Sequence, residues 1–176
     1  LNYDLWQGPA PKRPYKSNVV HYNWHWFWHW GNGELGNNGV HGLDLCRWGL
    51  QVDLPIRTFS SGISAITGDD QETPDTHLVA WEFDGGKQIT YQGVSRSNNA
   101  PGPFISFYGT EGYMEVDSNG GYKIFDNRKK LIEEQTGLGL GDREHLTNFF
   151  TAIRSNDPSL LNQPIESGHK STMLCL

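Results

Sequence analysis

The sequence predicts an α+β fold, an open and mostly antiparallel sheet with helices packed on one face. Two observations carry this prediction: short segments between residues 56 and 125 alternate apolar and polar residues, and glycine-containing turns separate several of them. The turns at 84–86, 109–112 and 118–121 are short enough to join antiparallel neighbours. Helices are expected to cover one face of the sheet, which leaves the other face for a partner or for solvent.

Helical patterns flank the strand region on both sides. Residues 34–50 place apolar residues at helical spacing, although each glycine there costs about 1 kcal/mol relative to alanine. A second helix is expected from Asp142, which suits the N-cap position. Its apolar face predicts a packed helix and consists of Leu146, Phe149, Phe150 and Ile153. Residues 164–176 begin a third helical pattern that stops without a cap, so we expect the chain to be truncated at its C-terminus.

The first part of the chain is expected to be extended. Three prolines between residues 9 and 14 disfavour a helix, so residues 1–20 predict an extended arm that lies over another surface. Between His21 and Trp30, histidines and other residues alternate with aromatic rings, which predicts a strand. The length suits one ordinary domain, and we expect residues 1–176 to form a single unit.

Charge and hydropathy exclude two classes of partner. The chain has 14 Lys and Arg residues against 20 Asp and Glu, a net charge of -6. Because no basic stripe is present, neither a nucleic acid nor an anionic membrane surface is expected as a partner. No apolar run approaches the roughly 20 residues of a membrane span, and no signal-peptide pattern opens the chain. Cys46 and Cys175 are too few for a disulfide framework and are expected to be small buried hydrophobes.

The histidine- and tryptophan-rich stretch at residues 21–30 allows three interpretations. His21, His25 and His29 could share a metal, but no closing ligands are visible in the sequence, so no metal site is expected. Polar residues on a half-exposed face that hydrogen bond locally are favoured instead. The tryptophans most simply belong to a core. Sugar stacking stays open, because a pyranose offers an apolar C–H face to an indole. Trp24, Trp26 and His25 are the candidate substrate-binding residues on that interpretation.

One face of the helix predicted at 34–50 carries a line of polar residues that ends in an aromatic ring. Its members, at offsets of 0, 3, 7, 10 and 14, are Glu34, Asn37, His41, Asp44 and Trp48. His41 is a candidate proton acceptor, because Asp44 one turn away can hold one of its ring nitrogens as a donor. Asn37 can both donate to and accept from a substrate hydroxyl. Gly36 and Gly39 allow a cofactor or another backbone to come close. Spacing alone does not separate this site from a solvated polar face.

Four segments resemble the C-terminal domain of the glucose–fructose oxidoreductase, inositol dehydrogenase and rhizopine-catabolism (Gfo/Idh/MocA) family. They are "NYDLWQGPAP" at 2–11, "HYNWHWFWHWGNGELGNNGVHGLDLCRWGL" at 21–50, "FYGTEGYMEV" at 107–116 and "HLTNFFTAIRSND" at 145–157. The similarity covers nearly the whole chain. It implies the substrate side of an NAD(P)-dependent oxidoreductase that acts on a hydroxyl of a sugar, cyclitol or related carbohydrate.

The resemblance also implies a cofactor and a partner. NAD or NADP would be bound mainly by an N-terminal Rossmann domain, whose strand–GxGxxG–helix unit is not found in this chain. The fragment alone is therefore not expected to be active. A homo-oligomer through the open sheet face is implied as well. The cytoplasm is the expected compartment, with an exported or periplasmic location as the alternative, since relatives can carry export signals.

Site residues carry over position by position. His41 matches the family's active-site histidine, Asp44 its following aspartate, and Gly39 its glycine-rich segment. Asn37 stands where the family has an aspartate, which keeps hydrogen bonding but removes a negative charge.

Two charged residues on the proline-rich arm complete the candidate set. Lys12 is assigned to the cofactor and Arg13 to the substrate. Two functions from other classes stay open beside the oxidoreductase: a carbohydrate-binding module that uses aromatic stacking, and a structural oligomerisation domain.

Overall fold

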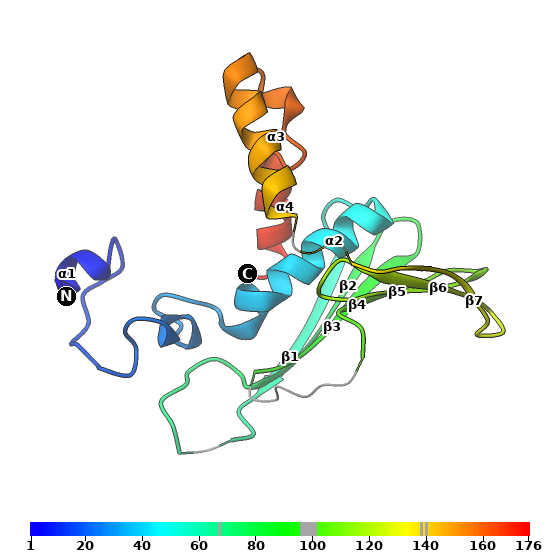
Figure 1. Ribbon diagram of the computed structural model, residues 1–176. Helices are drawn as coiled ribbons and strands as arrows, with labels where there is room; N and C mark the ends of the chain where they lie inside the picture. Colours follow the sequence, from blue (N-terminus) through cyan, green and yellow to red (C-terminus); the bar gives the residue numbers. More distant parts are fainter. Residues whose placement is uncertain (67, 96–101, 138, 140) are drawn as a thin grey trace. The chain divides into compact units, whose positions relative to one another are not determined.

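The computed structural model describes residues 1–66, 68–95, 102–137, 139 and 141–176 (Figure 1). Contacts within the chain divide it into two compact units. Unit 1 comprises Leu1–Asn98 with Lys170–Leu176, and unit 2 comprises Asn99–His169. Each unit has its own antiparallel sheet, so the α+β class is confirmed, while the strands expected in one sheet form two. Alternation along a strand defines which face is apolar but does not choose its neighbours, and this is why the division escaped prediction.

The sheet of unit 1 has the order β1-β2-β3. Its strands are β1 Arg57–Ile63, β2 Thr76–Phe83 and β3 Lys87–Val94. The predicted hairpin at 84–86 joins β2 to β3, and its Gly85 and Gly86 have φ of 75° and 72°, a region that favours glycine.

One face of this sheet is covered by α2, which spans Val40–Leu50 and follows a π-helical turn, η2, at Leu35–Gly39 (Figure 1). The end of α4 (Ile165–Met173) and the residues after it complete the layer. The buried core consists of Leu35, Leu43, Val79, Trp81, Phe83, Ile89, Leu174 and Cys175. The helix predicted at 34–50 and its placement on one face of the sheet are therefore confirmed in unit 1.

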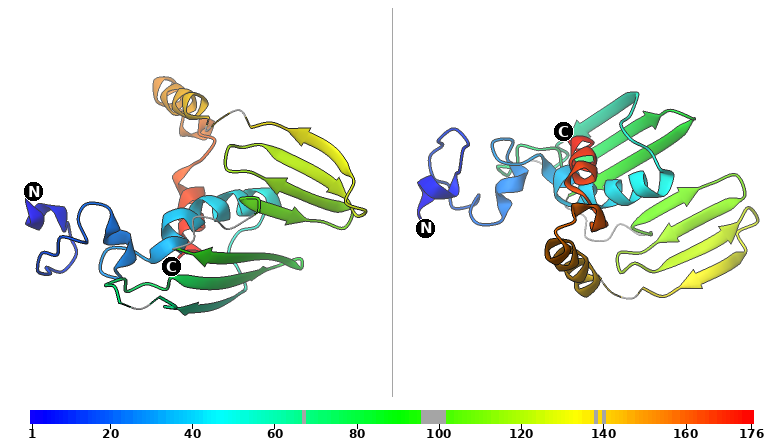
Figure 2. Two further views of the ribbon diagram at one scale, coloured as in Figure 1. Left: turned by 60° about the horizontal axis from the view of Figure 1, so that its bottom comes forward. Right: turned by 90° about the horizontal axis from the view of Figure 1, so that it is seen from above.

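Unit 2 contains a four-stranded meander in the order β4-β5-β6-β7 (Figure 2). Its strands are β4 Ile105–Tyr108, β5 Gly112–Val116, β6 Tyr122–Asp126 and β7 Leu131–Gln135. The two predicted turns at 109–112 and 118–121 join the first three strands as expected. The fourth strand was not predicted, because its sequence "LIEEQ" lacks alternation; it is an exposed and charged edge strand.

The helix after residue 141 differs from its prediction in two ways. α3 spans Asp142–Ser155, and its N-cap is Gly141 with φ of 70°, so Asp142 is the first helical residue rather than the cap. A 3-10 turn, η3, follows at Pro158–Leu160. The apolar face expected to be packed is between 46% and 58% exposed and consists of Leu146, Phe149, Phe150 and Ile153. Helical periodicity shows that a face is apolar but not what covers it.

The N-terminal segments fold into turns rather than an extended arm and a strand. α1 covers Tyr3–Trp6, ahead of the prolines, and the side chain of Asn2 caps it by accepting from the Leu5 amide at 3.2 Å. The alternating stretch contains a 3-10 turn, η1, at Asn23–Trp26. The predicted strand is wrong because this stretch folds back on itself, so closely that a Cβ on Gly31 would overlap the His25 backbone.

Both cysteines are free; Cys175 is buried and Cys46 is half-buried. Burial raises the pKa of each thiol to about 11. Because the thiolate is the nucleophile, the reactive fraction near pH 8 should be roughly a hundredfold below that of an ordinary thiol, and it should grow as the pH approaches 11. Alkylation followed by mass spectrometry is expected to be slow on the native protein. The same reaction in urea supplies the fast reference, and fast native labelling at this pH would contradict the burial.

Candidate functional site

The predicted polar line begins at Glu34, just before η2, and continues along α2 to Trp48. His41 is the second residue of α2, and its side chain is exposed. Asn37 is half-buried, and its amide lies 3.5 Å from the carboxylate of Glu34. Asn38 donates to the same carboxylate at 2.6 Å. The start of α2 therefore offers the His41 imidazole to solvent, while the amides of Asn37 and Asn38 hold the Glu34 carboxylate in the preceding turn.

Asp44 is held by the last helix of the chain. The hydroxyl of Ser171 donates to its carboxylate at 2.5 Å, and Arg47 donates to the same hydroxyl at 2.7 Å. Arg47 is only 7% exposed, so a buried cation lies behind the aspartate. The carboxylate one turn from His41 is thus fixed in place by α2 and α4 together.

The buried arginine makes a second set of contacts. Its guanidinium lies 3.6 Å from the carboxylate of Asp53, which also pairs with Lys170 at 2.8 Å. We call Asp44, Arg47, Asp53, Lys170 and Ser171 the α2–α4 clasp. Sequence reasoning missed it. The spacing of Asp44 and Arg47 on one helix was the available signal, but no local pattern indicates Ser171.

Two glycines of η2, Gly36 and Gly39, pack closely against side chains of this chain. A Cβ on Gly36 would overlap the Asn32 side chain, and a Cβ on Gly39 would lie 3.1 Å from both Leu35 and the Tyr91 ring. Close packing therefore explains why the helix tolerates glycine here. The Tyr91 hydroxyl is buried without a hydrogen-bond partner among the described residues, and burial with the nearby charge of Glu34 raises its pKa above the usual range.

The candidate substrate-binding residues of the aromatic segment differ in exposure and in surroundings. Trp24 is partly exposed and lines a hollow of about 250 Å³ together with Trp6 and Trp30. His25 is only 4% exposed, so the expectation of a half-exposed polar residue is wrong at this position. Its ring packs edge-on against Tyr22 and Trp24 and tilted against Trp26.

Metal ligation finds no support in the described part of the chain. No group of three His, Cys, Asp or Glu side chains lies close enough together there to hold an ion. His29 instead hydrogen bonds to the carbonyl of Pro11.

Among the residues that the structure describes, no helix is both long and apolar enough to cross a membrane.

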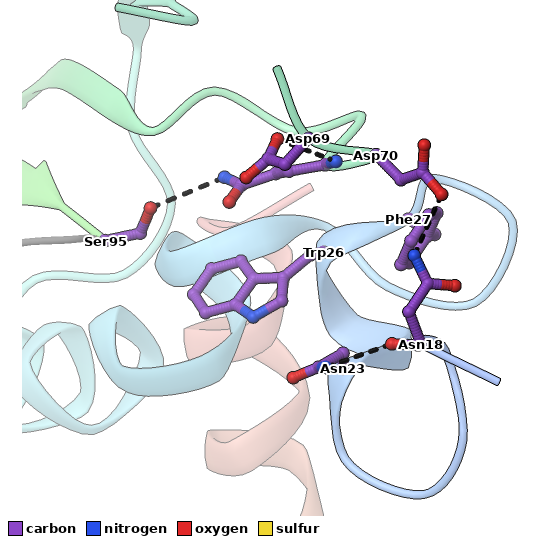
Figure 3. A pocket seen from close by; sticks show the side chains of 8 residues that line it. Asn18, Asn23, Trp26, Phe27, Asp69, Asp70 and Ser95 are labelled. Carbon is purple, nitrogen blue, oxygen red and sulfur yellow. Dashed lines mark hydrogen bonds between the residues drawn. The ribbon is translucent and has the colours of Figure 1, made fainter. Parts of the chain in front are cut away.

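Trp26 lies at a second pocket, of about 320 Å³, that brings together three distant parts of unit 1 (Figure 3). Polar side chains surround the indole, and Figure 3 shows the Trp26 ring between Asn23 and Ser95. The other lining residues are Asn18, Phe27, Asp69, Asp70 and Gln71. Trp26 was a predicted binding residue, but its partners at 69–71 and 95 were not, because they lie 43 to 69 residues further along the chain.

The charged residues of the arm are engaged in ion pairs. Arg13 lies 3.1 Å from the carboxylate of Glu72, with its guanidinium 5.9 Å from the centre of the Trp30 ring. Lys12 pairs with Asp4 at 3.0 Å, and both side chains are well exposed. Such exposed pairs contribute little stability and leave both cations able to exchange partners.

Unit 1 is thus a two-layer α+β unit in which α2, with its polar residues, packs on one face of the sheet. Residues 1–175 match the family described as the oxidoreductase family, C-terminal alpha/beta domain, and the chain belongs to this Gfo/Idh/MocA family. No relative of the chain is found among curated proteins.

Solved structures of oxidoreductases share the fold. The UDP-N-acetylglucosamine 3-dehydrogenase from Acidithiobacillus ferrooxidans is 15% identical, with a TM-score of 0.61 over 98% of this chain and 54% of its own. An oxidoreductase from Agrobacterium radiobacter, in complex with NAD+, L-tartaric acid and magnesium, is 11% identical, with a TM-score of 0.57 over 82% of this chain and 45% of its own. The chain thus spans about half the length of either structure.

Proposed function

We propose that this chain is the substrate-side domain of an NAD(P)-dependent oxidoreductase that acts on a hydroxyl of a sugar, cyclitol or related carbohydrate. The observation that carries the proposal is the exposed His41 on the first turn of α2, one turn from a carboxylate that Ser171 fixes at 2.5 Å. Membership of an oxidoreductase family and structural neighbours such as the NAD+ complex support it.

In this proposal His41 handles the proton of the reacting hydroxyl. The O–H proton passes to the imidazole as the carbinol C–H leaves as hydride, so that a carbonyl forms and the ring becomes imidazolium. Asp44 orients and stabilises the charged ring, and its own position is set by the α2–α4 clasp. Asn37 positions the substrate hydroxyl or the amide of the nicotinamide. A bound nicotinamide supplies the hydride acceptor.

The residues at the start of α2 suit contact with the reacting hydroxyl and the nicotinamide ring rather than with the pyrophosphate of the cofactor. The glycines at the start of the helix are closed by Asn32 and Tyr91, which leaves no cradle for a pyrophosphate there. The cofactor contacts assigned to Gly39 and Lys12 stay predictions, and at Gly39 the packing of Leu35 and Tyr91 leaves little room for one. Arg13 and Trp24 stay predicted substrate contacts on the arm and the aromatic segment.

The test is nicotinamide reduction by the complete polypeptide that contains this chain. NAD+ or NADP+ would be offered with a panel of hexoses, hexosides and cyclitols, and nicotinamide absorbance would be followed. Reduction with at least one panel member is expected, whereas the 176-residue chain alone should be silent. A complete polypeptide that binds either nucleotide but oxidises no hydroxyl compound would overturn the proposal.

The open sheet face of unit 1 supports a homo-oligomer. In the register of β1, β2 and β3, the face opposite the core carries exposed apolar side chains. They are Phe59, Ile63, Leu78 and Val94. An exposed apolar patch of this kind marks an interaction surface, and a second copy of the protein is the proposed partner.

A further inference from the structure

We propose that the pocket around Trp26 is a saccharide-binding site that takes one neutral pyranose unit and discriminates against anionic sugars. This goes beyond the oxidoreductase proposal, because the described lining residues come from 18–27, 69–71 and 95 and none lies on α2. Binding there requires neither His41 nor a nicotinamide.

The lining of the pocket matches the two-sided chemistry of a pyranose. The Trp26 indole offers an apolar surface for the C–H face of the ring, and the buried Phe27 lies beside it in the pocket wall. Around it, amides and carboxylates offer both donors and acceptors for equatorial hydroxyls. The volume of about 320 Å³ lies at the lower end of ligand pockets, which suits one sugar unit rather than an oligosaccharide.

The polar rim is held in place before any ligand arrives. Asn23 donates to the Asn18 carbonyl at 3.0 Å, and the Asn18 amide donates to Asp70 at 2.8 Å. On the far side, the Gln71 amide lies 3.4 Å from the Ser95 hydroxyl and 2.9 Å from the Thr73 carbonyl. Figure 3 draws the bonds of Asn18 with Asn23 and Asp70, and the bond that reaches Ser95. A rim fixed in this way loses less conformational entropy on binding.

Hydrogen bonds to the Trp26 backbone and packing against a neighbouring ring hold the indole in place. The Trp26 carbonyl accepts from the amides of Glu72 and Thr73 at 3.0 and 3.2 Å. The buried His25 ring backs the indole, with 4.2 Å between ring centroids. A ring locked in this position serves as a stacking platform, because its orientation does not have to be selected on binding.

The charge of the rim sets the discrimination. Asp69 and Asp70 both line the pocket, and Lys16 lies 3.4 Å from the Asp70 carboxylate. The hydrogen bond from Asn18 and the charge of Lys16 hold the pKa of Asp70 below its usual range, so this carboxylate stays ionised at neutral pH. A neutral sugar can donate hydroxyls to these oxygens, whereas a uronate or a sugar phosphate meets like charge.

The test is isothermal titration of the chain with methyl β-glucopyranoside, methyl β-galactopyranoside and methyl α-mannopyranoside, in EDTA and without nicotinamide. At least one should bind with a Kd in the millimolar range, and methyl β-glucuronide should bind about tenfold more weakly or not at all. Trp26→Ala should weaken binding about tenfold. The matched control is Trp28→Ala, whose ring is exposed and lines neither tryptophan pocket, and it should leave the affinity unchanged.

Two further variants keep the test decisive if Trp26→Ala fails to fold. Asn23→Ala removes an exposed rim amide and should weaken binding of the neutral glycoside severalfold. Asp69→Asn keeps the oxygen that accepts from the Gln71 amide and should raise the affinity for the glucuronide. Absence of binding by every glycoside, or binding that neither Trp26→Ala nor Asn23→Ala weakens, overturns the inference. Neither result bears on nicotinamide reduction, which is measured separately.

Discussion

Replacing His41 with alanine is expected to lower kcat of the complete oxidoreductase by about 10²–10⁴, the usual contribution of a general base. The imidazole is exposed on the first turn of α2, where a substrate hydroxyl can reach it, and the clasp holds Asp44 one turn away. Loss of the base should act mainly on kcat, with KM changed little, because the contact strengthens as the proton moves. Steady-state kinetics with the best substrate of the panel measures both constants.

The matched control is His145→Ala, which removes an exposed histidine from α3 in unit 2. It should leave kcat within about twofold, since surface substitutions of this kind rarely act at a distance. Unchanged turnover in His41→Ala would remove the base from the proposed mechanism.

The parts of the fold that could be predicted are those in which local signals agree with one another. At residues 34–50, apolar spacing predicts a helix, and the structure forms η2 and α2 there with Leu35 and Leu43 buried. At 21–30, the alternation of rings also predicts a strand, yet no neighbouring strand accepts it and local turn bonds take over, such as Phe27 to the Trp24 carbonyl at 3.2 Å. Alternation along a segment is therefore not enough to form a strand when no neighbouring strand pairs with it.

The candidate site could likewise be predicted only where its residues are close in sequence. Asn37, His41 and Asp44 could be assigned to one helical segment from sequence, and the structure forms η2 and α2 there, while their joint action at a site stays a prediction. Ser171, which fixes Asp44, lies 127 residues away, and Ser95 reaches the Trp26 pocket from the end of β3. Contacts of such long sequence separation depend on how whole elements pack, and no periodicity encodes them.

Replacing Trp81 with alanine is expected to lower the free energy of unfolding of unit 1 by about 3–5 kcal/mol, the range for large aromatic residues removed from a core. Trp81 is 1% exposed at the centre of β2, opposite Thr58 on β1 and Ile89 on β3. It belongs to the same core as Leu43 of α2. Small domains are stable by only about 5–15 kcal/mol, so this variant should be close to unfolding at 37 °C. Urea unfolding followed by far-UV circular dichroism measures the change.

Trp48→Ala is the matched control, because it removes the same side chain from α2 at a position that is 79% exposed. Its effect should stay within about 0.5 kcal/mol, as for other surface substitutions. The comparison also separates packing from chemistry. If α2 is held in place by packing on this core, Trp81→Ala should lower the activity of the complete protein only in proportion to the fraction that unfolds. His41→Ala, in contrast, should lower kcat without lowering the free energy of unfolding. A loss below about 1 kcal/mol in Trp81→Ala, with an unchanged dependence on urea, would contradict the packing of α2 on β2 and with it the placement of His41.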